Sequence, residues 1–209
     1  MPSQVRRFAR RLPRRFLFLL LLSAAVALLP PASHAQATVV TFDPAHTQIS
    51  MTLDATLHTV HGTFKLKSGK IQFDPQTGKA SGSIVIDAAS GDTNDAGRDK
   101  KMHQDVLESS KFPEISFTAG SVKGAIPASG SAKVTLTGTF RVHGQDHPFT
   151  LDGSVDAPSG GQVHVKAKFD IPFKKWGMKD PSNFFLKVGD NVAIDIDATA
   201  RLSTVAATP

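Results

Sequence analysis

Two histidines three positions apart are the most metal-like feature of the chain. His58 and His61 flank Thr59 and Val60. On a helix this spacing would place both imidazoles on one face, but the residues around them alternate as in a strand, where the two side chains point to opposite sides. No acidic residue or cysteine stands nearby at the spacing that metal ligands need. We therefore expect no metal site. A metalloprotein that depends on these histidines is the least favoured interpretation of the function.

Motifs for nucleophilic catalysis and phosphate binding are missing as well. The chain has no cysteine and no Gly-x-Ser-x-Gly sequence, the motif that positions a catalytic serine in many hydrolases. Gly69-Lys70 resembles a phosphate-binding loop only superficially, because the spacing is wrong and no helix follows. We therefore expect no catalytic residues, no cofactor and no enzymatic activity.

An arginine and an aspartate, Arg98-Asp99, stand side by side at the start of the only expected helix. Arginine forms fixed, multidentate contacts with carboxylates and carbonyl oxygens. Two interpretations stay open: a clamp that holds the helix to a sheet, or a contact to the head group of a ligand.

An aromatic group surrounds the single tryptophan. Trp176-Gly177-Met178 is followed by Pro181, Phe184 and Phe185. Tryptophan prefers sites where its apolar body is buried and its N–H still finds a partner. The group is expected either to pack in the core or to line the mouth of a cavity, where a methionine adapts well to the shape of a ligand.

Strands must position these residues, because apolar residues alternate through much of the chain. In the runs 163–173 and 192–198 every second residue is apolar, the period of a strand with one buried face. Further strands are expected at 37–57, 60–66, 71–73, 83–87, 115–118, 121–124, 133–142, 148–155 and 184–188. About eight antiparallel strands at hairpin spacing predict an all-β fold, a closed barrel or a sandwich. An eight-stranded barrel has room for one elongated apolar ligand.

One stretch, residues 93–110, has helical rather than strand spacing. Its apolar and basic positions recur every three or four residues, at Arg98, Met102, Val106 and Leu107. Asn94 and Asp95 are candidate N-caps, and Pro113 follows the stretch. This pattern predicts one short helix that plugs an end of the barrel.

The first 35 residues have a different character. Six arginines precede the apolar run 16–29, and Ser33-His34-Ala35 places small residues at positions −3 and −1 of a cleavage site. This pattern predicts a cleaved secretory signal peptide, residues 1–35, followed by one domain, residues 36–209. A membrane anchor is the alternative, and it is disfavoured because the apolar run is short for a bilayer span.

Charge and cysteine content narrow the class of partner. The chain has 24 basic and 18 acidic residues, but six arginines lie in the first 35 residues, so the remainder carries 18 of each. A near-neutral chain lacks the excess of positive charge with which proteins bind nucleic acid, so we expect no such partner. An exported protein without cysteine suits a bacterial periplasm, which is the expected location.

Several short motifs together resemble the YceI-like family over about residues 38–201. In chain order they are Phe42-Asp43-Pro44-Ala45-His46-Thr47, Gly62-Thr63-Phe64, Phe73-Asp74-Pro75, Arg98-Asp99, Phe112-Pro113-Glu114-Ile115-Ser116-Phe117, Leu136-Thr137-Gly138-Thr139-Phe140, His143-Gly144 and Trp176-Gly177-Met178. The resemblance implies an exported bacterial protein with an antiparallel, lipocalin-like β-barrel. In some members it also implies a polyisoprenoid or another long apolar amphiphile bound in the barrel, without enzymatic activity.

Together these observations predict a periplasmic carrier for an isoprenoid-type lipid, such as a polyisoprenoid or an isoprenoid quinone. The residues expected to contact the ligand are Met51, Leu53, Phe64, Phe117, Phe140, Phe169, Phe173 and Trp176, each pointing inward, with Arg98 as a candidate for the head group. The alternative is a stress or secretion accessory protein whose barrel is filled and whose loops do the work. Exposed edge strands and the family resemblance make a homodimer a further expectation.

Overall fold

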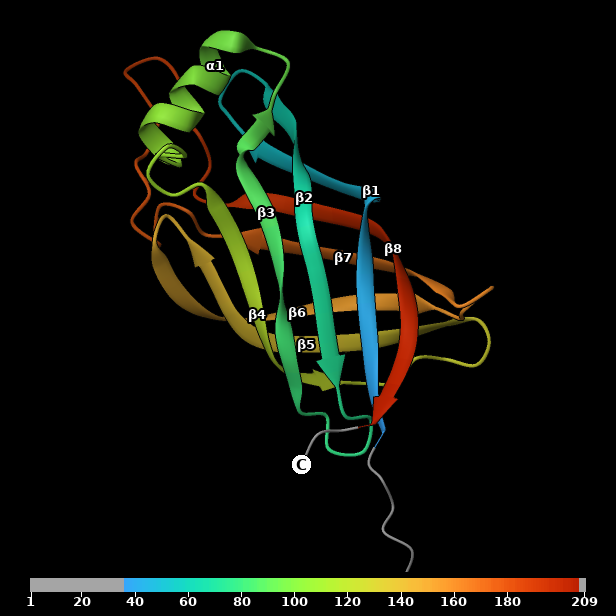
Figure 1. The fold of residues 1–209 in the computed structure, drawn as a ribbon. Helices are drawn as coiled ribbons and strands as arrows, with labels where there is room; N and C mark the ends of the chain where they lie inside the picture. The colour runs from blue at the N-terminus through green and yellow to red at the C-terminus, as the bar shows by residue number, and fades with distance from the viewer. Residues whose placement is uncertain (1–35, 207–209) are drawn as a thin grey trace, which may run out of the picture. The chain divides into compact units, whose positions relative to one another are not determined.

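Residues 36–206, the part of the chain that the structure describes, form a closed barrel of eight antiparallel strands in this computed structural model (Figure 1). Each strand pairs with the next in sequence, and β8 closes the barrel by pairing with β1. The strands are β1 (Gln36–Asp54), β2 (Thr59–Phe73), β3 (Ala80–Asp92), β4 (Glu114–Lys123), β5 (Ser131–Val142), β6 (Gln145–Asp156), β7 (Gln162–Ile171) and β8 (Val192–Ala206). The predicted all-β, lipocalin-like barrel of about eight strands with one short helix is confirmed. The predicted signal peptide, residues 1–35, lies outside the described residues.

Alternating apolar residues place one face of each strand inside the barrel. The clearest case is β7 against β8, where Val163 pairs with Ala200 and Phe169 pairs with Ile194. Residues paired in an antiparallel register project from the same face, so all four side chains point inward. Val163 and Ala200 are almost completely buried, as their position requires. The period of two in the sequence is therefore the alternation of inward and outward side chains.

In two places, two strands that the sequence predicts separately form one continuous strand. Residues 60–66 and 71–73 both belong to β2, and residues 115–118 and 121–124 both belong to β4. The pairing of β2 with β3 shifts between Leu66 and Ser68, which is a bulge. A bulge adds one residue and breaks the sequence alternation without ending the strand. Residues 184–188, expected as a short strand, form a loop instead.

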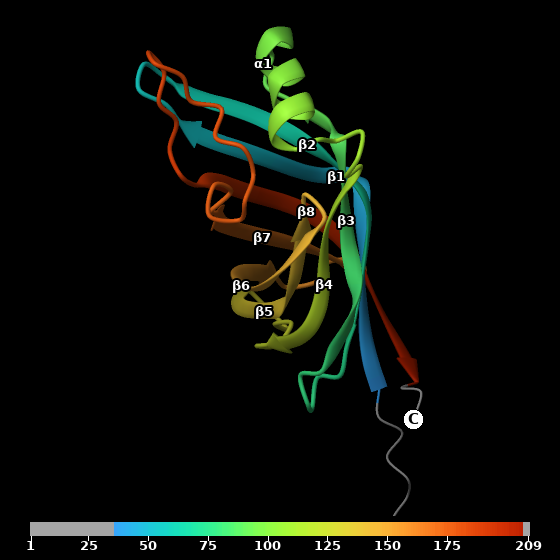
Figure 2. The same cartoon turned by 90° about the vertical axis from the view of Figure 1, so that its left-hand side faces the viewer.

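The helical segment is shorter than the predicted 93–110 and of mixed type. α1 (Ala96–Lys101) continues directly into a π-helical turn, η1 (Met102–Val106). The carboxylate of Asp95 caps α1 by accepting a 2.8 Å hydrogen bond from the backbone N–H of Arg98, as predicted for one of the candidate caps. Both views place α1 at one end of the barrel (Figure 1 and Figure 2).

The barrel wall is weakest between β6 and β7. These strands form only three residue pairs, which join 153–155 to 165–167, whereas β5 and β6 pair along the whole of β6. Part of each facing edge therefore lacks a strand partner. Because the barrel is otherwise closed, few exposed edges remain to support a homodimer among residues 36–206. A homodimer stays a prediction.

Candidate functional site

A cavity of about 450 Å³ lies inside the barrel, next to α1 and η1. This volume is within the range of small-molecule sites in proteins, about 300–1,000 Å³. The helical segment, the β7–β8 loop and the β1–β2 turn form one end of the cavity, and inward side chains of the strands form the rest of the wall. The strand residues of the wall are all apolar: Ile49, Met51, Leu53, Val60, Phe64, Ile86, Ile115, Phe140, Val142, Phe169, Ile171, Val192, Ile194 and Ile196.

The other half of the barrel is filled. Val155, Val163 and Ala200 form a buried cluster there, and none of the three lines the cavity. Along β8 the inward residues change from valine and isoleucine at the cavity to Ala198 and Ala200, both 0% exposed. Small side chains without exposed surface leave no room for larger ones at native packing density. The barrel is therefore hollow at the helical end and solid at the other, which contradicts the wholly filled barrel of the accessory-protein alternative.

Most residues predicted to contact a ligand meet at this cavity. Those that line it are Met51, Leu53, Phe64, Arg98, Phe140, Phe169 and Phe173. They come from four strands, from α1 and from the segment that follows β7, so only the tertiary fold brings them together. Their position on the wall is established, and their contact with a ligand stays a prediction.

Phe117, also predicted to contact a ligand, does not line this cavity, and its contact with a ligand stays a prediction. It is 5% exposed and belongs to the buried core. Its ring lies against Gly138 of the neighbouring strand β5, where an added Cβ would come within 2.8 Å of the ring Cζ and would also clash with the carbonyl oxygen of Thr118. Because position 138 has no side chain, the phenylalanine ring packs against the sheet rather than projecting into the cavity.

Trp176 also lies outside the wall of this cavity, and of its two interpretations the packing one describes its position; its contact with a ligand stays a prediction. The indole stacks on the imidazole of His147, with ring centroids 4.2 Å apart and planes inclined by 4°. It also contacts Phe140 and Phe149, with centroid separations of 5.6 and 5.8 Å. His147 and Phe149 belong to the part of β6 that has no partner on β7. Trp176 therefore fills the weak point of the wall and reaches the cavity only through Phe140.

Arg98 and Asp99 hold the start of α1 to the end of β3 through one buried residue, Thr93, which is 4% exposed. The Arg98 side chain donates from Nε to the Thr93 hydroxyl and from Nη2 to the Thr93 carbonyl, both at 2.7 Å. Asp99 accepts hydrogen bonds from the Thr93 backbone N–H at 2.9 Å and from its hydroxyl at 2.5 Å. This geometry supports the clamp interpretation. Arg98 also lines the cavity, so a contact to a head group stays a prediction.

The polar side chains of the cavity wall gather at the helical end. They are His58 from the β1–β2 turn, Thr93, Arg98 and Lys101 from α1 and the residues before it, and Asn183 from the β7–β8 loop. Two of the five carry a permanent positive charge, and no acidic residue belongs to the wall. An apolar interior with a few polar groups at one end is the usual design of a site that orients an amphiphilic ligand.

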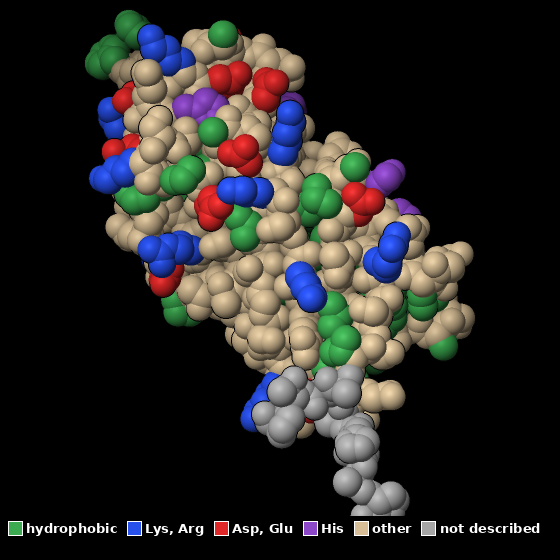
Figure 3. Space-filling view, viewed as in Figure 1, with side chains coloured by type: hydrophobic (Ala, Val, Ile, Leu, Met, Phe, Trp, Pro, Cys, Tyr) green, Lys and Arg blue, Asp and Glu red, His purple; other side chains and the backbone are tan. Residues whose placement is uncertain are grey.

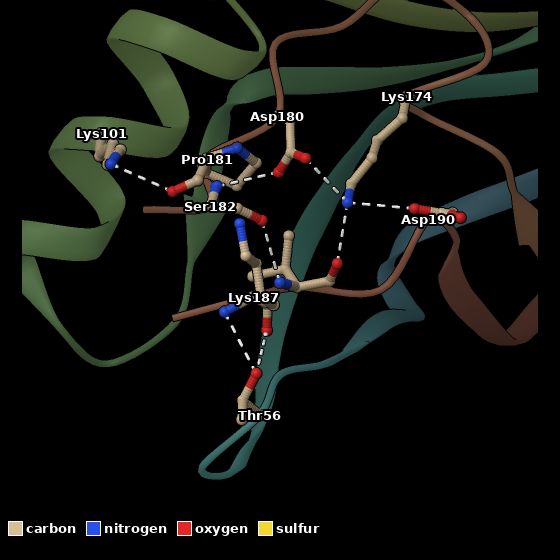
Figure 4. Close-up of polar contacts among 9 residues, drawn as sticks. Thr56, Lys101, Lys174, Asp180, Pro181, Ser182, Lys187 and Asp190 are labelled. Atoms are coloured by element: carbon tan, nitrogen blue, oxygen red, sulfur yellow. Dashed lines mark hydrogen bonds and ion pairs between the residues drawn. The ribbon is translucent and has the colours of Figure 1, made fainter. Parts of the chain in front are cut away.

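A lysine that follows β7 holds the β7–β8 loop in place (Figure 4). The Nζ of Lys174 donates to the carbonyl of Val188 at 2.8 Å and pairs with Asp180 at 3.0 Å and Asp190 at 3.1 Å. Partial burial lowers the pKa of Lys174, but the bonds to both carboxylates outweigh this and raise it overall. The hydroxyl and backbone N–H of Ser182, together with Lys174, lower the pKa of Asp180 to about 2. Lys174 and Asp180 are therefore both charged at neutral pH.

The same loop is bonded to both of its neighbours, as Figure 4 also shows. The backbone N–H and hydroxyl of Thr56, in the β1–β2 turn, donate to the carbonyl of Lys187 at 2.9 and 3.1 Å. Lys101 of α1 donates to the carbonyl of Pro181 at 3.2 Å. Because Pro181 and Leu186 line the cavity, these bonds fix the end wall of the cavity to the barrel and to the helix.

Sequence reasoning missed the part of the wall contributed by β8 and the apolar residues contributed by the helical segment. Val192, Ile194 and Ile196 line the cavity, as do Met102 and Leu107. The alternation along β8 does show that its even-numbered residues point inward. It cannot show which of them meet a void, because that depends on side chains from strands far away in the sequence.

No group of three or more His, Cys, Asp or Glu side chains within residues 36–206 is placed to hold a metal ion. The Nδ1 of His61 shares a 3.3 Å hydrogen bond with the hydroxyl of Thr52, and His58 lines the cavity.

In the same part of the chain, no helix is both long enough and apolar enough to cross a membrane.

Comparison with known proteins identifies the family. Residues 40–200 match the YceI-like domain. The chain belongs to the YceI-like family. It is 32% identical over 127 residues to Protein YceI of Escherichia coli O157:H7, an alignment that covers 57% of this chain and 64% of the relative. It is 34% identical over 129 residues to a UPF0312 protein of Pseudomonas savastanoi pv. phaseolicola, covering 58% and 65%. The chain thus spans a little less than two thirds of the length of both relatives.

Two solved structures have the same YceI-like barrel. A polyisoprenoid binding domain from Saccharophagus degradans, implicated in plant cell wall breakdown, matches with a TM-score of 0.64 and 15% identity, over 78% of this chain and 98% of that domain. BcnA of Burkholderia cenocepacia matches with a TM-score of 0.61 and 22% identity, over 76% and 98%. At these identities the likeness establishes the fold.

Proposed function

We propose that this YceI-like protein is a periplasmic carrier that holds an isoprenoid-type lipid, or another long apolar amphiphile, inside the helical half of the barrel. The single observation that carries the proposal is the cavity of about 450 Å³, whose strand-derived wall is entirely apolar. A void of this kind in a protein interior forfeits packing contacts, so an apolar occupant would stabilise the barrel. The role is binding and transport without catalysis.

The energetics favour a chain of several isoprene units. Burial of apolar surface contributes about 0.8 kcal/mol per CH₂, so one five-carbon unit contributes about 4 kcal/mol before ordering losses. Association costs about 4–15 kcal/mol in lost freedom. Several units therefore suffice for stable binding without any specific polar contact, and we expect tolerance for different head groups.

The distribution of polar residues suggests the orientation of the lipid. The tail would lie among the strand residues, and the head group would lie beside Arg98, Lys101, His58 and Asn183 at the helical end. Two permanent positive charges favour a head group that is anionic or rich in hydrogen-bond acceptors, such as a phosphate or a quinone carbonyl. Arg98 uses Nε and Nη2 on Thr93, so its Nη1 is the guanidinium nitrogen best placed for a ligand.

The relatives support this proposal at the level of the family. One structure with the same barrel is described as a polyisoprenoid binding domain, and its likeness to this chain concerns the fold. The periplasmic location rests on the export signal predicted in residues 1–35 and on the absence of cysteine.

The direct test is to identify what the protein carries. Mature protein, expressed with its own signal sequence and purified without detergent, is extracted with organic solvent and the extract is analysed by mass spectrometry. We expect an isoprenoid lipid at near-stoichiometric amount. Stripped protein is then titrated with an isoprenoid quinone and quenching of Trp176 is followed, because this residue contacts Phe140 on the cavity wall. No extracted lipid together with no quenching would overturn the proposal.

A further inference from the structure

Three large apolar side chains beside the cavity are mostly exposed to solvent. Leu57, Phe184 and Phe185 are 76%, 89% and 81% exposed, and Val205 at 40% is the only other exposed large hydrophobic residue in the described range. Leu57 lies in the β1–β2 turn, and the phenylalanines lie in the β7–β8 loop. In Figure 3, hydrophobic side chains project at the corner of the molecule where Figure 1 places this loop, next to basic side chains. Exposed apolar groups of this size usually mark an interaction surface.

The two phenylalanines are presented on a fixed turn. The side-chain carbonyl of Asn183 accepts hydrogen bonds from the backbone N–H groups of Phe185 and Leu186, at 2.9 and 2.8 Å. The backbone N–H of Asn183 donates to the Leu186 carbonyl at 2.8 Å, which closes the turn. Phe184 and Phe185 occupy its tip, with ring centroids 5.1 Å apart at 85°. Asn183 and Leu186, at the base of this turn, line the cavity. The base of the turn therefore faces the cavity, and its tip faces the solvent.

The β1–β2 turn is joined to this loop. Ala55 pairs with Val188 in a β-bridge, and Thr56 is bonded to Lys187 through its backbone and its hydroxyl. Leu57 follows directly in the same turn, and both views show the two turns together at the helical end (Figure 1 and Figure 2). We call residues 55–58 and 183–187 the docking turns.

The charges around the docking turns suit a lipid surface. Lys187 is exposed and forms no ion pair with any residue in the range 36–206. The nearest acidic groups of the loop, Asp180 and Asp190, are both paired with Lys174. Asp54 is the last residue of β1 before the β1–β2 turn, and its carboxylate accepts a hydrogen bond from the hydroxyl of Thr59 at 3.4 Å.

We propose that the docking turns insert their three apolar side chains into the interface of a phospholipid bilayer and so place the end of the cavity against the membrane. A convex tip of aromatic and aliphatic side chains flanked by lysine matches the way peripheral proteins bury apolar groups at the boundary between head groups and acyl chains. A groove for a peptide would be concave. This inference rests on the proposed function, because the lipid would then pass between bilayer and barrel along a path lined by Leu186 and Asn183 without crossing water.

The test is binding of the mature protein to unilamellar vesicles of phosphatidylethanolamine and phosphatidylglycerol, measured by flotation. Burial of one phenylalanine side chain is worth at least about a tenfold change in affinity. The double variant Phe184→Ser, Phe185→Ser should therefore bind the vesicles more weakly than the wild type, by at least about tenfold for each phenylalanine lost. Lys187→Gln should weaken binding by a few fold at low salt, and by less on vesicles of phosphatidylcholine alone. Val205→Ser, at the other end of β8, is the matched control and should bind like the wild type.

A second readout separates this inference from the proposed function. The double variant should take up a short-chain isoprenoid quinone from solution with wild-type affinity, yet extract the same quinone from vesicles more slowly. Wild-type protein that binds the quinone but not the vesicles overturns the docking inference and leaves the carrier function intact. Equal vesicle binding by the wild type and the double variant also overturns it. So does a wild-type dimer in light scattering that the double variant converts to a monomer, since the turns would then bind a second copy.

Discussion

Replacing Val192 with phenylalanine should fill part of the cavity while preserving the barrel. Val192 faces the cavity from β8 and is only partly buried. The change adds about four carbon atoms in space that a ligand then cannot occupy. At about 0.8 kcal/mol per CH₂, a bound chain loses about 3 kcal/mol, which is roughly a hundredfold in Kd. Because the ring enters existing space, the free energy of unfolding should change by less than about 1.5 kcal/mol.

The same substitution at Val163 is the matched control. Val163 also points inward, from β7, but it is 1% exposed and packs in the filled half of the barrel with Val155 and Ala200. Overpacking such a site costs about 1–3 kcal/mol of stability, or roughly 2–4 °C in Tm for each kcal/mol in a domain of this size. Since Val163 is not part of the cavity wall, Kd should change little in Val163→Phe.

Both quantities can be measured on the same samples. Quenching of Trp176 by a short-chain isoprenoid quinone gives Kd, and urea unfolding gives the free energy of unfolding. The reasoning predicts opposite patterns: weak binding with normal stability for Val192→Phe, and normal binding with reduced stability for Val163→Phe. If both variants lose stability equally, or if Val192→Phe binds the quinone as the wild type does, the helical half of the barrel is not the ligand site.

Three further predictions concern the groups that hold the site together. Thr93→Val should lower the free energy of unfolding by about 1.5–3 kcal/mol, because it removes a hydroxyl bonded to the charged group of Arg98; urea unfolding with an unchanged midpoint would contradict this. The pKa of Asp180, about 2, lies below that of an unfolded chain, so its stabilisation of the loop is complete above about pH 4 and is lost as the pH falls through about 2. A carbon NMR titration should show this pKa, and Lys174→Met should raise it; a pKa near 4 in both proteins would refute the pairing. Trp176→Ala should cost about 3 kcal/mol and Trp176→Phe clearly less, as compared by thermal unfolding; equal losses would show that packing in the gap between β6 and β7 is not what the residue provides.

The barrel could be predicted because its signal is local. Each strand carries its own alternation, and the strict period from 163 to 171 and from 192 to 198 makes the inward face of β7 and β8 certain before any pairing is known. The cap at Asp95 is equally local, since it needs only a carboxylate three residues before the N–H of Arg98. The predicted division of β2 and of β4 into two strands each was wrong because the prediction used only the local pattern. A bulge interrupts the local alternation while pairing with the next strand continues.

The site was less predictable because its signal is not local. Phe117 has the inward parity of a wall residue, yet it packs away from the cavity because Gly138 on another strand has no side chain. Trp176 is a residue type that often lies at the mouth of a cavity. It instead fills a gap that exists only because β6 and β7 diverge. The ion pairs of Lys174 join residues of a loop that has no periodic pattern, so they could not be predicted from the sequence.

The most direct test of the central claim is a crystal structure of the mature protein grown with a polyprenyl phosphate. We predict continuous density for the chain inside the helical half of the barrel, in contact with Met51, Phe140 and Val192, and with the phosphate beside Arg98 or Lys101. A cavity filled by its own side chains, or a lipid bound only on the outer surface, would contradict the account.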